Sequence, residues 1–202
     1  MSLIKTQITV LDFGARQVPR PLASLRCCQL NDPTEIAAAI QGAQRVVVIG
    51  SEADLASVLT RLMRSERLDI EVAHVPGRRG ARRALTGVAR RIPLVRDETA
   101  AAVVGAALWL PPGDSAVLRG EAVVDDVVLF DGEVTGVRIE PTAEIPGLRA
   151  AVLTGHRRRW VTGRAVQLGT VGAQVVRDGV TGSREVKRST FYRHTTGWLR
   201  VD

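Results

Sequence analysis

The sequence contains few cysteines and few aromatic residues, and each shortage excludes a class of protein. Its two cysteines, Cys27 and Cys28, are adjacent. Neighbouring side chains on a strand point to opposite faces, so we expect no structural disulfide, only reduced and buried thiols. Aromatic residues make up 3% of the chain, too few for the stacking surface of a protein that binds single-stranded nucleic acid. No Cys and His residues have the spacing of a metal site, so we predict no metal ligands.

Long apolar runs are also missing. No stretch approaches the roughly 20 apolar residues that span a bilayer, so we expect no transmembrane segment. The N-terminal residues, MSLIKTQITVLDFG, lack the zones of a secretory signal peptide, which predicts a cytoplasmic location. The hydrophobic fraction of 45% is nevertheless sufficient for a folded core.

Basic residues exceed acidic ones and give a net charge of +7. Only Lys5 and Lys187 are lysines, so the arginine content reflects a compositional bias as well as any binding role. Two arginine clusters stand out, one from Arg78 to Arg91 without any acid and one at 157–159 just before Trp160. Such clusters form solvated faces, or they bind an anionic ligand, an acidic protein partner or a membrane surface. We do not expect nucleic acid as a partner, since there is no helix-turn-helix pattern.

The most informative stretch runs from Arg45 to Arg67 and predicts a buried strand, a tight turn and an amphipathic helix. Val46 to Ile49 is a β-branched run typical of a parallel strand covered on both faces, and it ends at Gly50. Ser51 then occupies an N-cap position with Asp54 three residues later, as in a capping box. A helix N-terminus after such a strand is where α/β proteins bind phosphate.

The N-terminal half predicts an α/β domain. Strands at 8–11, 25–30, 46–49 and 69–75 alternate with a helix at 36–40 and with the amphipathic helix that follows Ser51, which indicates a mostly parallel sheet with helices on both sides. A basic helical segment then follows Gly77, and an Ala- and Val-rich segment from Thr99 to Leu110 predicts another helix.

The pattern changes after Pro111-Pro112-Gly113. From Ala116 onward the sequence shows only short strand-like runs separated by turns, the last of them from Trp198 to Val201. We therefore predict an all-β antiparallel domain at 114–202, following an α/β domain at 1–113.

Three segments together resemble the diacylglycerol kinase and related lipid kinase family, distant relatives of the ATP-NAD kinases. The family's central turn reads Gly-Gly-Asp-Gly-Thr, and residues 50–54 here read Gly-Ser-Glu-Ala-Asp before a similar helix. A second family element is a strand that ends in Pro, followed by a glycine-containing loop and Ala-Arg; residues 76–82 keep the proline, a glycine and the Ala-Arg ending. The Asp178-Gly179 turn is similar to the family's Asp-Gly-Glu turn.

The resemblance implies a set of candidate site residues. Gly50, Ser51, Gly77, Arg78 and Arg79 would contact phosphate or another anion. For catalysis, the resemblance leaves Glu52 and Asp178 as candidate acids and implies ATP and Mg²⁺ as cofactors if the chain is a kinase.

The substitutions in the central turn disfavour nucleotide. Ser51 and Ala53 add side chains where glycines allow close approach to phosphate, and Asp54 adds a negative charge beside any bound triphosphate. We therefore expect a non-catalytic relative of the lipid kinases that acts through binding or assembly.

Two alternatives stay open. One is a divergent ATP-dependent kinase for a lipid or a small hydroxylated acceptor. The other is a basic module that binds an anionic polymer or a membrane surface. Because a small β domain leaves strand edges exposed, we also predict a homodimer.

Overall fold

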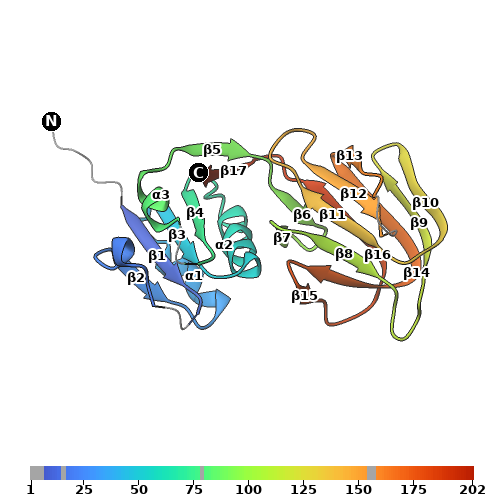
Figure 1. Ribbon diagram of the computed structural model, residues 1–202, viewed down its shortest axis with the longest axis horizontal. Helices are drawn as coiled ribbons and strands as arrows, with labels where there is room; N and C mark the ends of the chain where they lie inside the picture. The colour runs from blue at the N-terminus through green and yellow to red at the C-terminus, as the bar shows by residue number, and fades with distance from the viewer. Residues whose placement is uncertain (1–6, 15–16, 78–79, 154–157) are drawn as a thin grey trace. The chain divides into compact units, whose positions relative to one another are not determined.

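The chain folds into two compact units, each with its own sheet (Figure 1). The computed structural model describes residues 7–14, 17–77, 80–153 and 158–202. Unit 1 comprises residues 1–92 and the C-terminal residues 197–202, and unit 2 comprises residues 93–196. None of the helices in these described stretches is long and apolar enough to cross a membrane.

Unit 1 is an α/β sheet whose strands run mostly parallel, as predicted. Its described strands follow the order β2-β1-β3-β4-β17-β5, and β5 alone of these runs antiparallel to its neighbour. Their bounds are β1 (Ile8–Asp12), β2 (Arg26–Gln29), β3 (Arg45–Ile49), β4 (Glu71–Val75), β5 (Ala89–Ile92) and β17 (Trp198–Val201). The helical segments are η1 (Arg20–Leu22), η2 (Pro33–Glu35), α1 (Ile36–Ala39), α2 (Glu52–Arg64) and α3 (Ala81–Thr86).

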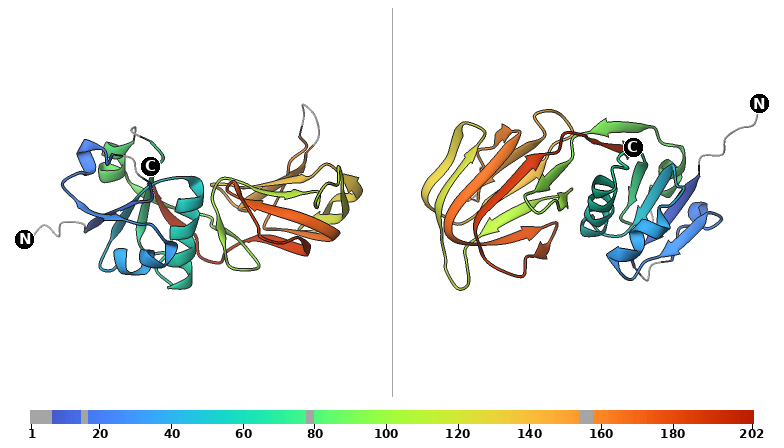
Figure 2. Two further views of the ribbon diagram at one scale, coloured as in Figure 1. Left: turned by 90° about the horizontal axis from the view of Figure 1, so that it is seen from below. Right: turned by 180° about the vertical axis from the view of Figure 1, so that it is seen from behind.

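Helices cover both faces of this sheet (Figure 2). Val47 and Ile49 of β3 pack in one buried cluster with Leu22 of η1 and Ala84 of α3. Val46 and Val48 alternate to the opposite face, where α1 and α2 lie. Both faces of β3 are therefore apolar because both are covered, which explains its unbroken β-branched sequence.

Unit 2 is an antiparallel β structure, which confirms the predicted fold class. The strands are β6 (Val95–Asp97), β7 (Ala102–Val103), β8 (Ala107–Leu110), β9 (Leu118–Val124), β10 (Val127–Val134), β11 (Val137–Pro141), β12 (Leu148–Val152), β13 (Val161–Gly163), β14 (Ala165–Arg177), β15 (Val180–Thr181) and β16 (Val186–Arg193). The long strand β14 pairs with β9 and β16 through its first half and with β8 and β15 through its second. The register shifts between Gly169 and Ala173, where β14 passes from one set of partners to the other.

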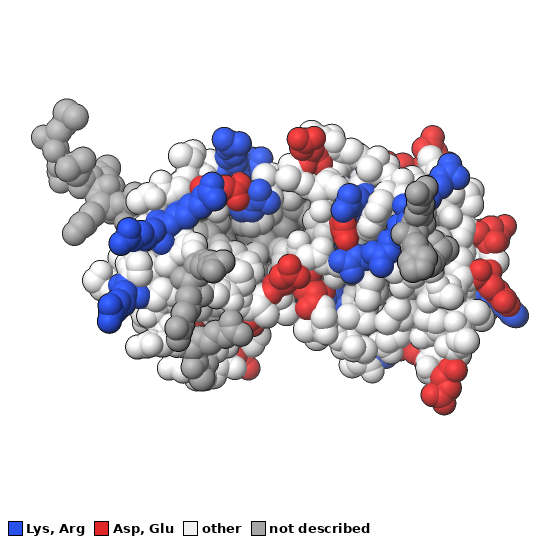
Figure 3. Space-filling model, in the orientation of Figure 1, with Lys and Arg blue, Asp and Glu red and all other residues white. Residues whose placement is uncertain are grey.

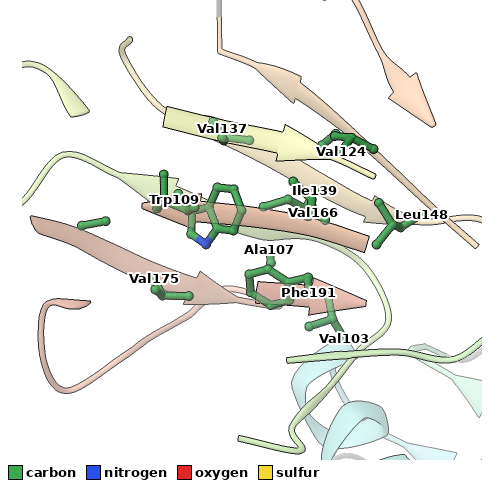
Figure 4. Packing of buried hydrophobic residues seen from close by; sticks show 14 of the residues in the cluster. Val103, Ala107, Trp109, Val124, Val137, Ile139, Leu148, Val166, Val175 and Phe191 are labelled. Carbon is green, nitrogen blue, oxygen red and sulfur yellow. The ribbon is translucent and has the colours of Figure 1, made fainter. Parts of the chain in front are cut away.

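The core of unit 2 lies where these two sets of strands face each other (Figure 4). Trp109 of β8 and Phe191 of β16 are fully buried, and their ring centroids are 5.8 Å apart. Val137, Ile139 and Leu148 are also fully buried in this cluster. Alternating apolar residues on both layers thus meet in one core, as in other antiparallel folds.

The predicted helix from Thr99 to Leu110 was wrong, because this segment forms β7 and β8. Along β8 the side chains alternate between buried and half-buried, and the strand pairs with β11 on one edge and β14 on the other. Alanine favours a helix locally, but pairing on both edges of β8 and the burial of Trp109 override that preference. In the described residues of the basic segment, from Gly80 onward, the helix α3 already ends at Thr86 and the chain then forms β5.

The domain boundary also differs from the predicted one at residue 113. Unit 2 already begins at Pro93, and the last strand, β17, returns to unit 1 between β4 and β5. The strand-like run Trp198–Val201 predicts a strand, but it carries no information about which sheet the strand joins. The two cysteines are free, as expected, but Cys27 is exposed and Cys28 half-buried rather than both buried.

Candidate functional site

The turn between β3 and α2 has an unstrained backbone, and its polar groups bind one another. Ser51 is the N-cap of α2 with φ −78° and ψ 174°, an extended conformation open to any residue. The serine that replaces the resembling family's second glycine is therefore unstrained. Behind the turn, Leu55, Val58, Leu59 and Leu62 of α2 are all buried, as their helical spacing predicts.

A complete capping box occupies the N-terminus of α2, as the sequence predicts. The Ser51 Oγ accepts the Asp54 N–H at 3.2 Å, and Asp54 Oδ2 accepts both the Ser51 N–H and the Ser51 Oγ–H at 2.7 Å. Asp54 also packs closely against Gly50, since a Cβ built on that glycine would lie 2.6 Å from Asp54 Oδ2. A carboxylate of the protein thus binds the backbone N–H that a phosphate would otherwise approach.

A cavity of about 290 Å³ opens beside this turn, where β1, β3 and β4 end. Its lining residues are Asp12, Phe13, Gly14, Ile49, Gly50, Ser51, Asp54 and Pro76. Among these described residues the two ionisable side chains are both acidic. The position, at the carboxyl ends of parallel strands, is where ligands of α/β proteins bind, but the lining charge opposes an anion.

Asp12 is the ionisable lining residue that sequence reasoning missed. It ends β1, is 6% exposed and accepts the Gly14 N–H through Oδ1 at 3.2 Å. The register pairs it with Ile49, the last residue of β3. The sequence shows Asp12 at the end of the first predicted strand, and the structure adds that this strand lies beside β3, so the two strand ends meet at one edge of the sheet.

His74 supports the turn from β4. Its Nε2 lies 3.0 Å from the Gly50 carbonyl oxygen, and β3 and β4 pair so that Val48 lies opposite His74. A carbonyl oxygen only accepts, so Nε2 carries the proton in this contact. Gly50 is therefore held by His74 on one side and packed against Asp54 on the other.

The structure brings together only some of the predicted site residues. Gly50 and Ser51 line the cavity, whereas Glu52 is exposed at the first position of α2 and is not among the lining residues. Gly77 follows the lining residue Pro76, and a Cβ on it would meet no atom within 4 Å. Arg78 and Arg79 lie outside the described residues.

Asp178, the other candidate acid, belongs to unit 2 and organises a loop there. Its carboxylate accepts the N–H groups of Val104, Gly105 and Ala106 at 3.1, 2.8 and 3.0 Å. Its own N–H donates to the Ala106 carbonyl at 2.8 Å. Asp178 has φ 47°, a left-handed conformation that aspartate tolerates better than most residues. These contacts give the aspartate a structural role between β7 and β8.

These residues do not fit ATP and Mg²⁺. The N-terminus of α2 is closed by Asp54, and the described lining of the cavity supplies carboxylates rather than cations to a polyphosphate. Within the described stretches, no three His, Cys, Asp or Glu side chains gather closely enough to hold a metal ion.

Solved structures share this fold over nearly the whole chain. A diacylglycerol kinase from Bacillus anthracis str. Sterne superposes with a TM-score of 0.75 at 10% identity, covering 97% of this chain and 96% of its own. The chain has the diacylglycerol kinase fold. An NAD kinase from Archaeoglobus fulgidus, solved in complex with ATP, superposes on this kinase-like fold with a TM-score of 0.66 at 13% identity. That match covers 96% of this chain and 93% of the NAD kinase. No protein-family model and no curated protein matches the sequence.

Proposed function

We propose that this chain is a non-catalytic relative of the diacylglycerol and lipid kinases that acts through binding or assembly. The observation that carries the proposal is the capping box at the N-terminus of α2, in which the Asp54 carboxylate accepts the Ser51 N–H at 2.7 Å. The kinase-like fold is retained, but the Asp54 carboxylate occupies the turn that would receive phosphate.

Electrostatics support the same conclusion. Asp12 and Asp54 both line the cavity, so a polyphosphate entering it would meet two like charges. Repulsion between unit charges about 4 Å apart ranges from about 1 kcal/mol in water to about 4 kcal/mol at the dielectric typical of a protein surface. Each such contact would weaken nucleotide binding by between about fivefold and several hundredfold.

The competing proposal is a divergent kinase in which Glu52 acts on a lipid or a small hydroxylated acceptor. Glu52 is exposed at the start of α2, so its carboxylate is accessible to a ligand outside the cavity. This alternative requires turnover, whereas a binding protein does not.

The experiment is phosphoryl transfer from radiolabelled ATP with Mg²⁺ to diacylglycerol in mixed micelles and to glycerol. We expect no product above that formed without protein. Glu52→Ala should behave as the unmodified protein does, and Asp114→Ala, an exposed acid in a loop of unit 2, serves as the matched control. Product formation that Glu52→Ala abolishes and Asp114→Ala preserves would overturn the non-catalytic proposal.

Assembly as a homodimer is part of this proposal. The strand β10 pairs with β9 and with no other strand in the described part of unit 2, and it exposes Val127 and Val128. An unpaired strand edge with apolar side chains is suited to pairing with a second copy. Multi-angle light scattering should give twice the mass of one chain, and Val128→Lys should reduce it to that of one chain. A monomeric mass for the unmodified protein would refute the dimer.

A further inference from the structure

The strand β5 forms one edge of the sheet of unit 1. It pairs with β17 through Ala89↔Val201 to Ile92↔Trp198, and the described residues place no strand on its other side. Alternate N–H and C=O groups of an edge strand point away from the sheet and can pair with an added strand. Val88, just before β5, is 71% exposed and adds an apolar contact at this edge.

Arginines lie on β5 itself, on the helix α3 just before it in the chain, and on its neighbour β17. Arg82 and Arg83 are exposed on α3, Arg90 and Arg91 are exposed on β5, and Arg200 lies on β17 opposite Arg90. Figure 3 shows the basic side chains of unit 1 as a band over this region with an acidic group within it. We call these five arginines and Val88 the β5 patch.

Asp202 is an acid next to the patch, and the pKa of its carboxyl group reflects the positive charge around it. Hydrogen bonds from Arg200, together with the charges of Arg83 and Arg90, lower the pKa of the Asp202 carboxyl below its usual value. Three guanidinium groups thus act on one carboxylate, so the cations outnumber this acid at the edge of β5.

The arginines of unit 1 differ in how they are used. Arg45 is buried and serves the fold, since it donates to the Ala84, Leu85 and Gly87 carbonyls and pairs with Glu71. Within the described residues, the guanidinium groups of Arg82, Arg83 and Arg90 donate no such hydrogen bond. The last two act on Asp202 through their charge. These three side chains are therefore accessible to a partner.

We propose that the β5 patch binds an extended acidic segment of a partner protein, which adds as a strand to the edge of β5. This inference rests on the proposed function, because it names the partner chemistry of a protein that acts by binding. Glutamate or aspartate on the added strand would pair with Arg82, Arg83 and Arg90, and an apolar residue would contact Val88.

An added polypeptide strand fits this surface better than other anions. Only a polypeptide uses both the free backbone groups of β5 and the surrounding guanidinium groups. The patch contains no aromatic residue on which a nucleic-acid base could stack. A lipid headgroup would use the arginines but leave the edge of β5 unpaired.

The test is a titration of a fluorescein-labelled peptide of alternating glutamate and valine, followed by fluorescence anisotropy at about 50 mM salt. We expect saturable binding that Arg82→Glu and Arg90→Glu each weaken by about tenfold or more, because each change replaces an attractive charge by a repulsive one. Arg188→Glu, at an exposed arginine of β16, is the matched control and should bind the peptide as the unmodified protein does.

Two further readouts separate strand addition from simple charge attraction. A peptide N-methylated at alternate residues keeps its charge but loses backbone donors, so we expect no binding. Hydrogen exchange should show new protection of β5 amides when the unmodified peptide is bound. Equal binding of both peptides, or no effect of Arg90→Glu, would overturn the inference. Tighter binding of single-stranded DNA or phosphatidylglycerol vesicles would also overturn it.

Failure here is distinguishable from failure of the proposed function. The titration contains neither ATP nor lipid acceptor, so absence of peptide binding overturns strand addition at β5 alone. Phosphoryl transfer to an acceptor would instead overturn the non-catalytic proposal.

Discussion

Replacing Asp54 with alanine should destabilise unit 1 and identify the capping box as a structural element. The substitution removes the acceptor of both the Ser51 N–H and the Ser51 Oγ–H. Loss of capping interactions costs about 1 kcal/mol. Loss of a negative charge in the first turn of a helix costs a further 0.3 to 1 kcal/mol, approximately. We therefore expect Asp54→Ala to lower the free energy of unfolding by about 1 to 2 kcal/mol.

The assay is urea denaturation followed by circular dichroism at 222 nm. Every α-helix in the described residues belongs to unit 1, so this signal reports on that unit. Glu52→Ala is the matched control, because it removes a charge from the same helix turn but no capping contact, and it should cost at most about 1 kcal/mol. An Asp54→Ala variant no less stable than Glu52→Ala would refute the capping argument.

Three further predictions concern side chains that the fold uses. Arg45→Met should destabilise unit 1 by about 3 to 5 kcal/mol in the same denaturation assay, because it leaves Glu71 and three carbonyls without their donor; a loss below about 1 kcal/mol would contradict this. Asp178→Ala should lower the stability of unit 2 by about 2 kcal/mol when tryptophan fluorescence is followed, since three N–H groups lose their acceptor. No change in fluorescence midpoint would argue against that structural role. Burial and the Arg96 charge lower the pKa of His194, so the folded state resists protonation. The stability of unit 2 should therefore fall as the pH drops below about 6.5, the unfolded value, and His194→Gln should flatten that dependence; identical pH profiles would contradict it.

Local patterns predicted the strand, turn and helix from β3 to α2 well, whereas β5 was not predicted as a strand. Three local patterns were recognisable: the β-branched run of β3, the capping box of Ser51 and Asp54, and the apolar stripe of α2. Each depends only on residues that are close together in the sequence. The fold class followed from the order of these elements, and the structures that superpose on the chain agree with it.

Long-range pairing could not be predicted in the same way. The segment Thr99–Leu110 has helical composition, but its neighbours β11 and β14 are contributed by residues far along the chain. The strand β17 follows the strand-like runs of unit 2 in the sequence, yet it pairs with β4 and β5 in the sheet of unit 1. Tertiary packing decides which strands pair, and the periodicity of a short segment does not reveal its pairing partner.

The candidate site was predicted in part. Gly50 and Ser51 line the cavity, because a strand-turn-helix connection places them there; their binding of an anion stays a prediction. Asp12 was missed because its role depends on β1 lying beside β3. Asp178 was considered as a catalytic acid, and the contacts that show its structural role are to backbone groups more than 70 positions earlier.

The most direct test of the central claim is the melting temperature of the unmodified protein with and without saturating ATP and Mg²⁺. A ligand at a hundred times its dissociation constant stabilises the folded state by about 2.7 kcal/mol, which is several degrees for a chain of this length. Because Asp54 closes the N-terminus of α2, we predict no change in melting temperature. A rise of several degrees would contradict the account and show that the turn after Gly50 holds nucleotide.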